Sequence, residues 1–199
     1  MEEIFLKAYH YWFGELNSPN DFPEHKAKLW FSASSETDQY LKQNFETALH
    51  EIVNAKIPLL ELDKKHQLGL ILILDQFSRN IFRKSPQAFA QDSLARNYLR
   101  QILDLGATNF YPVERVFLYL PLEHSENNDD QNLSVHLFTK LYDEVSDEQK
   151  EVFKDFLDFA FRHQLVIEKF GRFPHRNKLL GRTSTPEELE FLKQKPMGF

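Results

Sequence analysis

The chain has 199 residues, 42% of them hydrophobic and 19 of them phenylalanine, so it can build a sizeable core, and this composition argues against disorder. Its formal net charge of −6 argues against general nucleic-acid binding, which needs a broad basic surface. The absence of cysteine excludes disulfides, thiolate metal sites and cysteine catalysis, and is typical of a cytoplasmic protein.

Helical periodicity dominates the chain, and no segment alternates as a β-strand would. The first residues are acidic and lack the positive segment of a signal peptide. The predicted helices cover about 4–15, 37–55, 63–83, 85–105, 112–123, 129–145 and 146–170, with a short last helix after Thr185. Trp30 and Phe31 are expected to anchor the long loop over 16–35 to the core. We therefore predict an all-α bundle of about seven to nine helices, forming a single domain over 1–199.

Several helix ends carry recognisable signals. Ser85 stands before Pro86 as an N-cap, and Thr185 stands in the same relation to Pro186. Residues 146–149 have the pattern of a capping box. Pro121 removes a hydrogen bond inside its helix, which predicts a kink or an early end there.

The third helix carries the sharpest anomaly. Its segment 68–74 is apolar all round, which predicts a buried helix, and it is too short to span a bilayer. One stripe along this helix holds four residues, of which the last two are charged: Leu68, Leu72, Asp75 and Arg79. Gln76 and Asn80 flank this stripe. Two interpretations stay open: a buried ion pair with supporting amides, or the wall of a polar pocket.

A second polar stripe lies on the fifth helix, where Arg115, Tyr119 and Glu123 share one arc. His124 follows Glu123 at the expected helix break, and a carboxylate beside an imidazole is a reasonable acid–base pair. The alternative is an ordinary C-terminal helix cap with acids exposed to solvent, and this alternative describes Ser125 and Glu126 better than it describes Glu123.

The segment 170–185 is a basic loop rich in glycine and proline. Between residues 162 and 182 the chain has one acid, Glu168, and six cations: Arg162, Lys169, Arg172, Arg176, Lys178 and Arg182. A positive loop in an acidic chain needs either acidic side chains of its own fold or an anionic ligand.

Metal binding is a rival interpretation for the histidines and acids Glu123, His124, His136, His163 and His175. None of them forms a helical zinc motif, and His163 lies on an apolar stripe, as a buried core histidine does. The phosphate-binding, dinucleotide-binding and serine-hydrolase motifs are absent. We therefore predict no metal and no cofactor.

Taken together, these segments resemble the uncharacterised bacterial family known as domain of unknown function 924. The matching segments are YWFGE at 11–15, LILDQFSRNIF at 72–82, AFAQD at 88–92, ER at 114–115, YLPLEHSEN at 119–127, FGRFPHRN at 170–177, LGR at 180–182 and STPEE at 184–188. The resemblance implies a tetratricopeptide-like helical bundle and no settled activity. Ser78 stands where the family usually has proline, which should make this helix straighter.

The sequence favours binding, with turnover as an extension, of a small anionic or polar ligand. Glu123, His124 and His175 are the catalytic candidates. The predicted ligand-binding residues are Asp75, Gln76, Arg79, Asn80, Arg115, Tyr119, Arg172, Arg176, Asn177 and Arg182. We expect segments 75–80, 115–124 and 172–182 to meet in space. The alternative is a noncatalytic scaffold that binds a protein or peptide, with the polar motifs forming an internal salt-bridge network.

Overall fold

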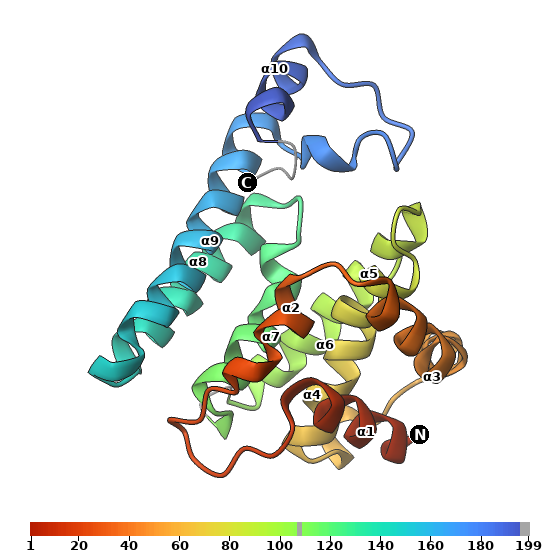
Figure 1. Ribbon diagram of the computed structural model, residues 1–199, viewed down its shortest axis with the longest axis vertical. Coiled ribbons are helices and arrows are strands. Elements are labelled where there is room, and N and C mark those ends of the chain that lie inside the picture. Colours follow the sequence, from red (N-terminus) through yellow and green to blue (C-terminus); the bar gives the residue numbers. More distant parts are fainter. Residues whose placement is uncertain (107–108, 196–199) are drawn as a thin grey trace. The chain divides into compact units, whose positions relative to one another are not determined.

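The computed structural model describes residues 1–106 and 109–195, and this part of the chain is helical with no β-strand (Figure 1). The predicted all-α fold is confirmed. The chain divides into two compact units, Met1–Leu118 and Tyr119–Phe199, which are described one at a time. A single domain over 1–199 stays a prediction. No helix in the described ranges has the length and apolar character needed to cross a bilayer.

The first unit is built on the contact between α1 (Glu2–Phe13) and α4 (Lys64–Leu72). Helix α1 buries Phe5, Tyr9 and Trp12 completely or nearly so and ends at Gly14, whose φ of 73° favours glycine. The two backbones approach so closely at Gly69 that a Cβ there would lie 2.0 Å from the Phe5 carbonyl oxygen. Glycine is therefore required at this position.

The long segment between α1 and α3 (Ser35–Asn54) contains a short helix, α2 (Ala27–Phe31), that propensity alone did not indicate. Trp30 is 8% exposed, and its indole N–H donates to the Trp12 carbonyl over 3.0 Å, so it anchors the segment as predicted. Phe31 is 60% exposed, so the expectation that both aromatics anchor the loop is wrong for Phe31.

The buried third helix is not regular. Helix α4 passes into a π-helical turn, Ile73–Phe77, and then into α5 (Ser78–Ile81). The backbone N–H of Ser78 donates five residues back to Ile73, and its hydroxyl donates to the Leu74 carbonyl over 2.7 Å. Serine at position 78 therefore does not give the straight helix expected from the loss of proline, because its own hydrogen bonds support the wide turn.

The predicted helix over 85–105 is divided into a 3₁₀ turn, Pro86–Phe89, and α6 (Asp92–Asp104). The Ser85 hydroxyl accepts from Gln87 N–H, which confirms this cap. Helix α7 (Pro112–Glu123) has the predicted bounds and continues for two residues beyond Pro121. The boundary between the two units lies inside α7.

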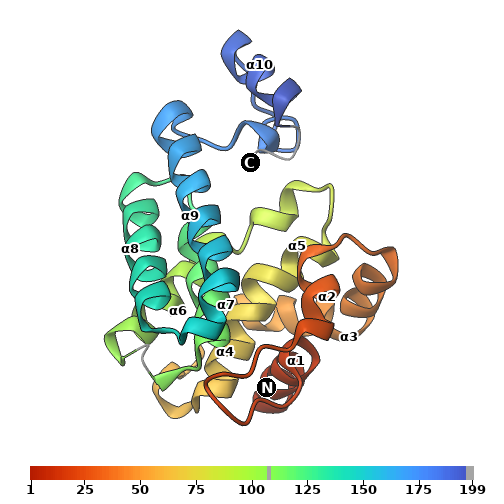
Figure 2. The same cartoon turned by 60° about the vertical axis from the view of Figure 1, so that its left-hand side comes forward.

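In the second unit, α8 (Asn128–Glu144) and α9 (Lys150–Phe170) lie side by side and antiparallel (Figures 1 and 2). A 3₁₀ turn, Asp147–Gln149, joins them, and the Ser146 side chain makes no cap hydrogen bond, so the predicted capping box there is wrong. The N-cap predicted at Thr185 is confirmed at the start of α10 (Pro186–Gln194), where Thr185 and Glu188 also form a capping box that was not predicted from the sequence. A small apolar core joins the end of α9, the basic loop and α10: Val166, Ile167, Phe170, Phe173 and Phe191.

Candidate functional site

The basic loop of the second unit begins where α9 ends at Gly171, in the left-handed conformation with a φ of 66°. Arg172 follows, and its Nε and one terminal nitrogen donate to the two carboxylate oxygens of Glu188 over 2.6 and 2.8 Å. Glu188 also accepts from the Asn177 amide and the Thr185 backbone N–H. The Arg172 hydrogen bond is the main reason that the pKa of Glu188 falls to about 2.

A second bidentate pair closes the loop on the turn after α7. Arg182 donates to the two oxygens of Glu126 over 2.6 and 2.9 Å, and it also donates to the Phe173 carbonyl and the Asn177 side-chain oxygen. Burial would raise the pKa of Glu126, but hydrogen bonds from Arg182 and the Phe173 N–H lower it below its usual value. Arg172, Asn177 and Arg182, predicted as ligand-binding residues, thus hold the loop in place.

Five side chains of the second unit, which we call the histidine cluster, gather inside this loop: Glu123, His124, His163, His175 and Arg176. Glu123 and His163 are 1% and 2% exposed. The Nδ1 atom of His163 lies 2.9 Å from the Phe159 carbonyl oxygen and 3.3 Å from a carboxylate oxygen of Glu123. His163 was interpreted from the sequence as a core histidine, and the structure adds its contact with a predicted catalytic residue.

The ring of Phe173 lies beside three members of the histidine cluster. The Arg176 guanidinium lies 4.4 Å from its centroid, a cation–π distance, and the His163 and His175 rings lie at 5.6 and 5.7 Å. Arg176 is buried and donates to the His124 carbonyl over 3.0 Å. Sequence segments 123–124, 163 and 175–176 are therefore brought together within one unit.

Burial sets the protonation of the two deeper imidazoles. It lowers the pKa of His163 well below its usual value and that of His175 to about 4, and the nearby Arg176 charge adds to both effects. Both side chains are therefore neutral at pH 7.

The end of α7 that carries Glu123 is held by Gln131 of α8. Its side-chain amide donates to the carbonyls of Glu123 and Ser125, each over 2.7 Å. These carbonyls lack partners inside the helix, so the amide caps the helix end. The Ser125 hydroxyl donates to Asp130 over 2.6 Å, which fixes the following turn.

The first unit contains the other predicted polar set. The expected i,i+4 pair is present, with Arg79 3.2 Å from Asp75, and Arg79 also donates to both oxygens of Asp92 over 2.9 and 3.1 Å. Gln76 donates to Asp75, and the Asn80 amide donates to the Gln76 carbonyl. Asp92 belongs to a quoted family motif but was not predicted as a partner, since sequence alone does not pair residues thirteen positions apart.

A buried carboxylate on α7, Glu114, was also missed. It is 0% exposed and accepts from the Tyr9 hydroxyl over 2.5 Å and the Tyr111 N–H over 2.6 Å, with the Lys64 ammonium at 3.8 Å. The signal available in the sequence was a lone acid inside the apolar run of α7. The predicted Arg115 is 7% exposed on the same helix, and Tyr119 packs edge-on against Phe138.

The Asp75 set and the histidine cluster belong to different units, so the predicted meeting of segments 75–80, 115–124 and 172–182 stays a prediction. Over residues 1–106 and 109–195, no three histidine or acidic side chains are grouped as a metal site. His136 is exposed on α8.

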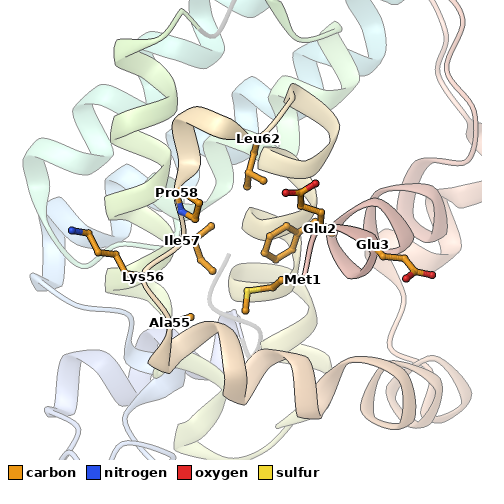
Figure 3. A pocket seen from close by; sticks show the side chains of 9 residues that line it. Met1, Glu2, Glu3, Ala55, Lys56, Ile57, Pro58 and Leu62 are labelled. Carbon is orange, nitrogen blue, oxygen red and sulfur yellow. The ribbon is translucent and has the colours of Figure 1, made fainter.

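An open cavity of about 400 Å³ lies in the first unit, and none of its lining residues is a predicted site residue. Met1 and Ile57 point toward it, whereas Glu3 and Lys56 point away (Figure 3). Its lining residues are Met1, Glu2, Glu3, Phe5, Ala55, Lys56, Ile57, Pro58 and Leu62.

The described residues thus define an all-helical protein with paired charges and histidines in its interior. The chain belongs to a family of bacterial proteins of unknown function, DUF924, whose model matches residues 8–196. This confirms the resemblance seen in the sequence motifs. The structure is similar to that of a protein of unknown function, ATU0120 from Agrobacterium tumefaciens, with a TM-score of 0.76 and 31% identity over 87% of this chain and 93% of that chain. No curated protein matches the sequence.

Proposed function

We propose that the histidine cluster binds a small polar or anionic molecule and exchanges a proton with it. The observation that supports this proposal is the collection of ionisable groups in the histidine cluster, three of them no more than 5% exposed: Glu123, His163 and Arg176. Buried ionisable groups with displaced pKa values gather at functional sites more often than elsewhere. Desolvation offsets most of the stability that such groups add, so stability alone is a weak reason for keeping them.

The members of the histidine cluster differ in exposure and charge, and we assign them different roles on that basis. Arg176 supplies the positive charge for an anionic group. His124 and His175 are partly exposed and would contact the molecule, while Glu123 and His163 lie deeper and would handle the proton. Arg172 and Arg182 support the loop in this proposal, because Glu188 and Glu126 already engage them in bidentate pairs.

A thermal-shift screen of small polar metabolites tests the proposal. A true ligand at a hundred times its Kd adds about 2.7 kcal/mol to the free energy of unfolding. We expect this stabilisation to disappear in His175→Gln and Arg176→Met. It should persist in the matched controls His136→Gln on α8 and Arg162→Met on α9, whose side chains are exposed. Equal stabilisation in both pairs of variants would place the binding elsewhere.

The second candidate function is a scaffold that binds a protein or peptide. The two internal arginine–glutamate pairs favour it, and so do the exposed apolar side chains Phe161 and Leu165 on α9, at 42% and 60% exposure. The same screen separates the candidates, because a scaffold of this kind is not stabilised by small polar molecules. Its binding would instead be weakened by Leu165→Glu and left unchanged by His175→Gln.

A further inference from the structure

We propose that the open cavity of the first unit is the centre of a two-fold interface between two copies of this chain. The proposal is independent of the histidine cluster, because every residue that carries it belongs to Met1–Leu118. Two observations support it: exposed apolar side chains adjoin the cavity, and charges of opposite sign lie on its two sides.

The cavity is lined mainly by apolar side chains. Phe5, Ile57 and Leu62 belong to the core of the unit, and the exposed Met1 points toward the same space (Figure 3). The volume of about 400 Å³ lies in the range of pockets that accept a drug-sized molecule. A branched apolar side chain of a partner is therefore small enough to enter it.

An exposed leucine stands beside this cavity. Leu60 lies in the turn between the lining residues Pro58 and Leu62, and its side chain is 75% exposed. No other large apolar side chain in the described ranges is exposed to this extent. Val53, near the end of α3 and two residues before the lining residue Ala55, is also exposed. Apolar groups that collect on one surface mark an interaction site more often than single scattered ones do.

The charged residues at the cavity select a second copy as the partner. Figure 3 shows Glu3 and Lys56 on opposite sides of the cavity, both pointing away from it, with Glu2 on the side of Glu3. Neither Glu3 nor Lys56 forms an ion pair with another described residue. A two-fold axis through the cavity exchanges its two sides, so it brings Glu3 of one copy opposite Lys56 of the other, twice. A partner with charge of one sign would be repelled on one side.

The same axis places the exposed leucine of each copy beside the cavity of the other, because Leu60 adjoins the cavity of its own chain. The dimer thus joins a projecting side chain to a hollow at two equivalent places, with an acid and a base facing each other on either side. Every contact occurs twice in such an isologous interface, so a single substitution changes the binding free energy twice over.

Sedimentation velocity of the full chain over about 1–100 μM tests the dimer, and we expect a reversible monomer–dimer equilibrium in this range. Leu60→Glu should raise the Kd by about thirtyfold or more, as the loss of an interface hot spot does. The control Leu165→Glu, on the exposed face of α9, should leave the Kd unchanged. A chain that stays monomeric, with a cavity that only binds a small alcohol such as hexanol, overturns the proposal, and so does a dimer that both variants weaken equally.

Charge reversal tests the two-fold pairing itself. Glu3→Lys and Lys56→Glu, each alone, place like charges across the axis, so each should weaken the dimer by about tenfold. An equimolar mixture of these two variants should recover a Kd near that of the wild type, because the mixed dimer joins opposite charges at both contacts. The control Lys140→Glu, exposed on α8, should have no effect. A mixture that dimerises no better than either variant alone overturns the proposal.

Discussion

Replacing Arg182 with methionine should destabilise the second unit strongly. The substitution keeps much of the apolar stem and removes four hydrogen bonds: two to Glu126, one to the Phe173 carbonyl and one to Asn177. Glu126 is 27% exposed, and in the variant it keeps only the hydrogen bond that the Phe173 N–H donates to it. Breaking a buried pair costs roughly 3–5 kcal/mol, and the partial exposure places this pair near the lower end, at about 3 kcal/mol.

Urea denaturation followed by far-UV circular dichroism measures this loss. With an m-value of about 2 kcal/mol/M, the midpoint should fall by about 1.5 M. The matched control is Arg162→Met, because Arg162 is exposed on α9 and donates only to a carbonyl of its own helix, so it should cost less than about 0.5 kcal/mol. Adding Glu126→Gln to Arg182→Met should restore part of the stability, since the remaining group carries no charge. Equal midpoints for Arg182→Met and Arg162→Met would refute the assignment of Arg182 as the residue that holds the loop.

Three further predictions concern stability. The pKa of Glu188 is about 2 in the fold against 4.5 for the free side chain, so the ionised carboxylate stabilises the fold fully above pH 4.5 and this stabilisation is lost as the pH falls toward 2. Urea midpoints measured across this pH range should show the loss. In Arg172→Met the midpoint should depend less on pH. Gly69→Ala should cost about 3 kcal/mol in thermal unfolding, because the added Cβ would meet the backbone of Phe5; a loss below about 1 kcal/mol would contradict the close packing. Thr185→Ala should cost about 1 kcal/mol through loss of the cap, and Thr185→Ser should restore it, as hydrogen exchange of α10 amides would report.

The sequence predicted the features of the fold that depend on near neighbours. Apolar periodicity located the long helices, and the caps at Ser85 and Thr185 were confirmed because their partners lie two or three residues away. The α2 helix was missed because Pro19, Pro23 and the serines around it are typical of a loop, whereas burial of Trp30 decided its structure.

The same distinction holds for the polar residues. The Asp75–Arg79 pair was predictable because it joins consecutive turns of one helix. The Arg182–Glu126 pair joins residues 56 positions apart, so the sequence did not indicate it, and a solvated acid at a helix end remained an open alternative for Glu126. His163 was interpreted as a core residue only, because its contact with the Glu123 carboxylate comes from another helix and the sequence of its own helix does not indicate it.

The wide turn over Ile73–Phe77 gives the buried helix a place where the chain length can change. A π-helical turn holds one residue more than the α-helical path between the same ends. Deleting one residue inside 73–77 would restore regular geometry and leave the flanking faces aligned. A deletion elsewhere in the helix would rotate every later side chain by about 100° and bring polar residues against the core. Insertions and deletions between relatives are therefore expected to fall within this turn.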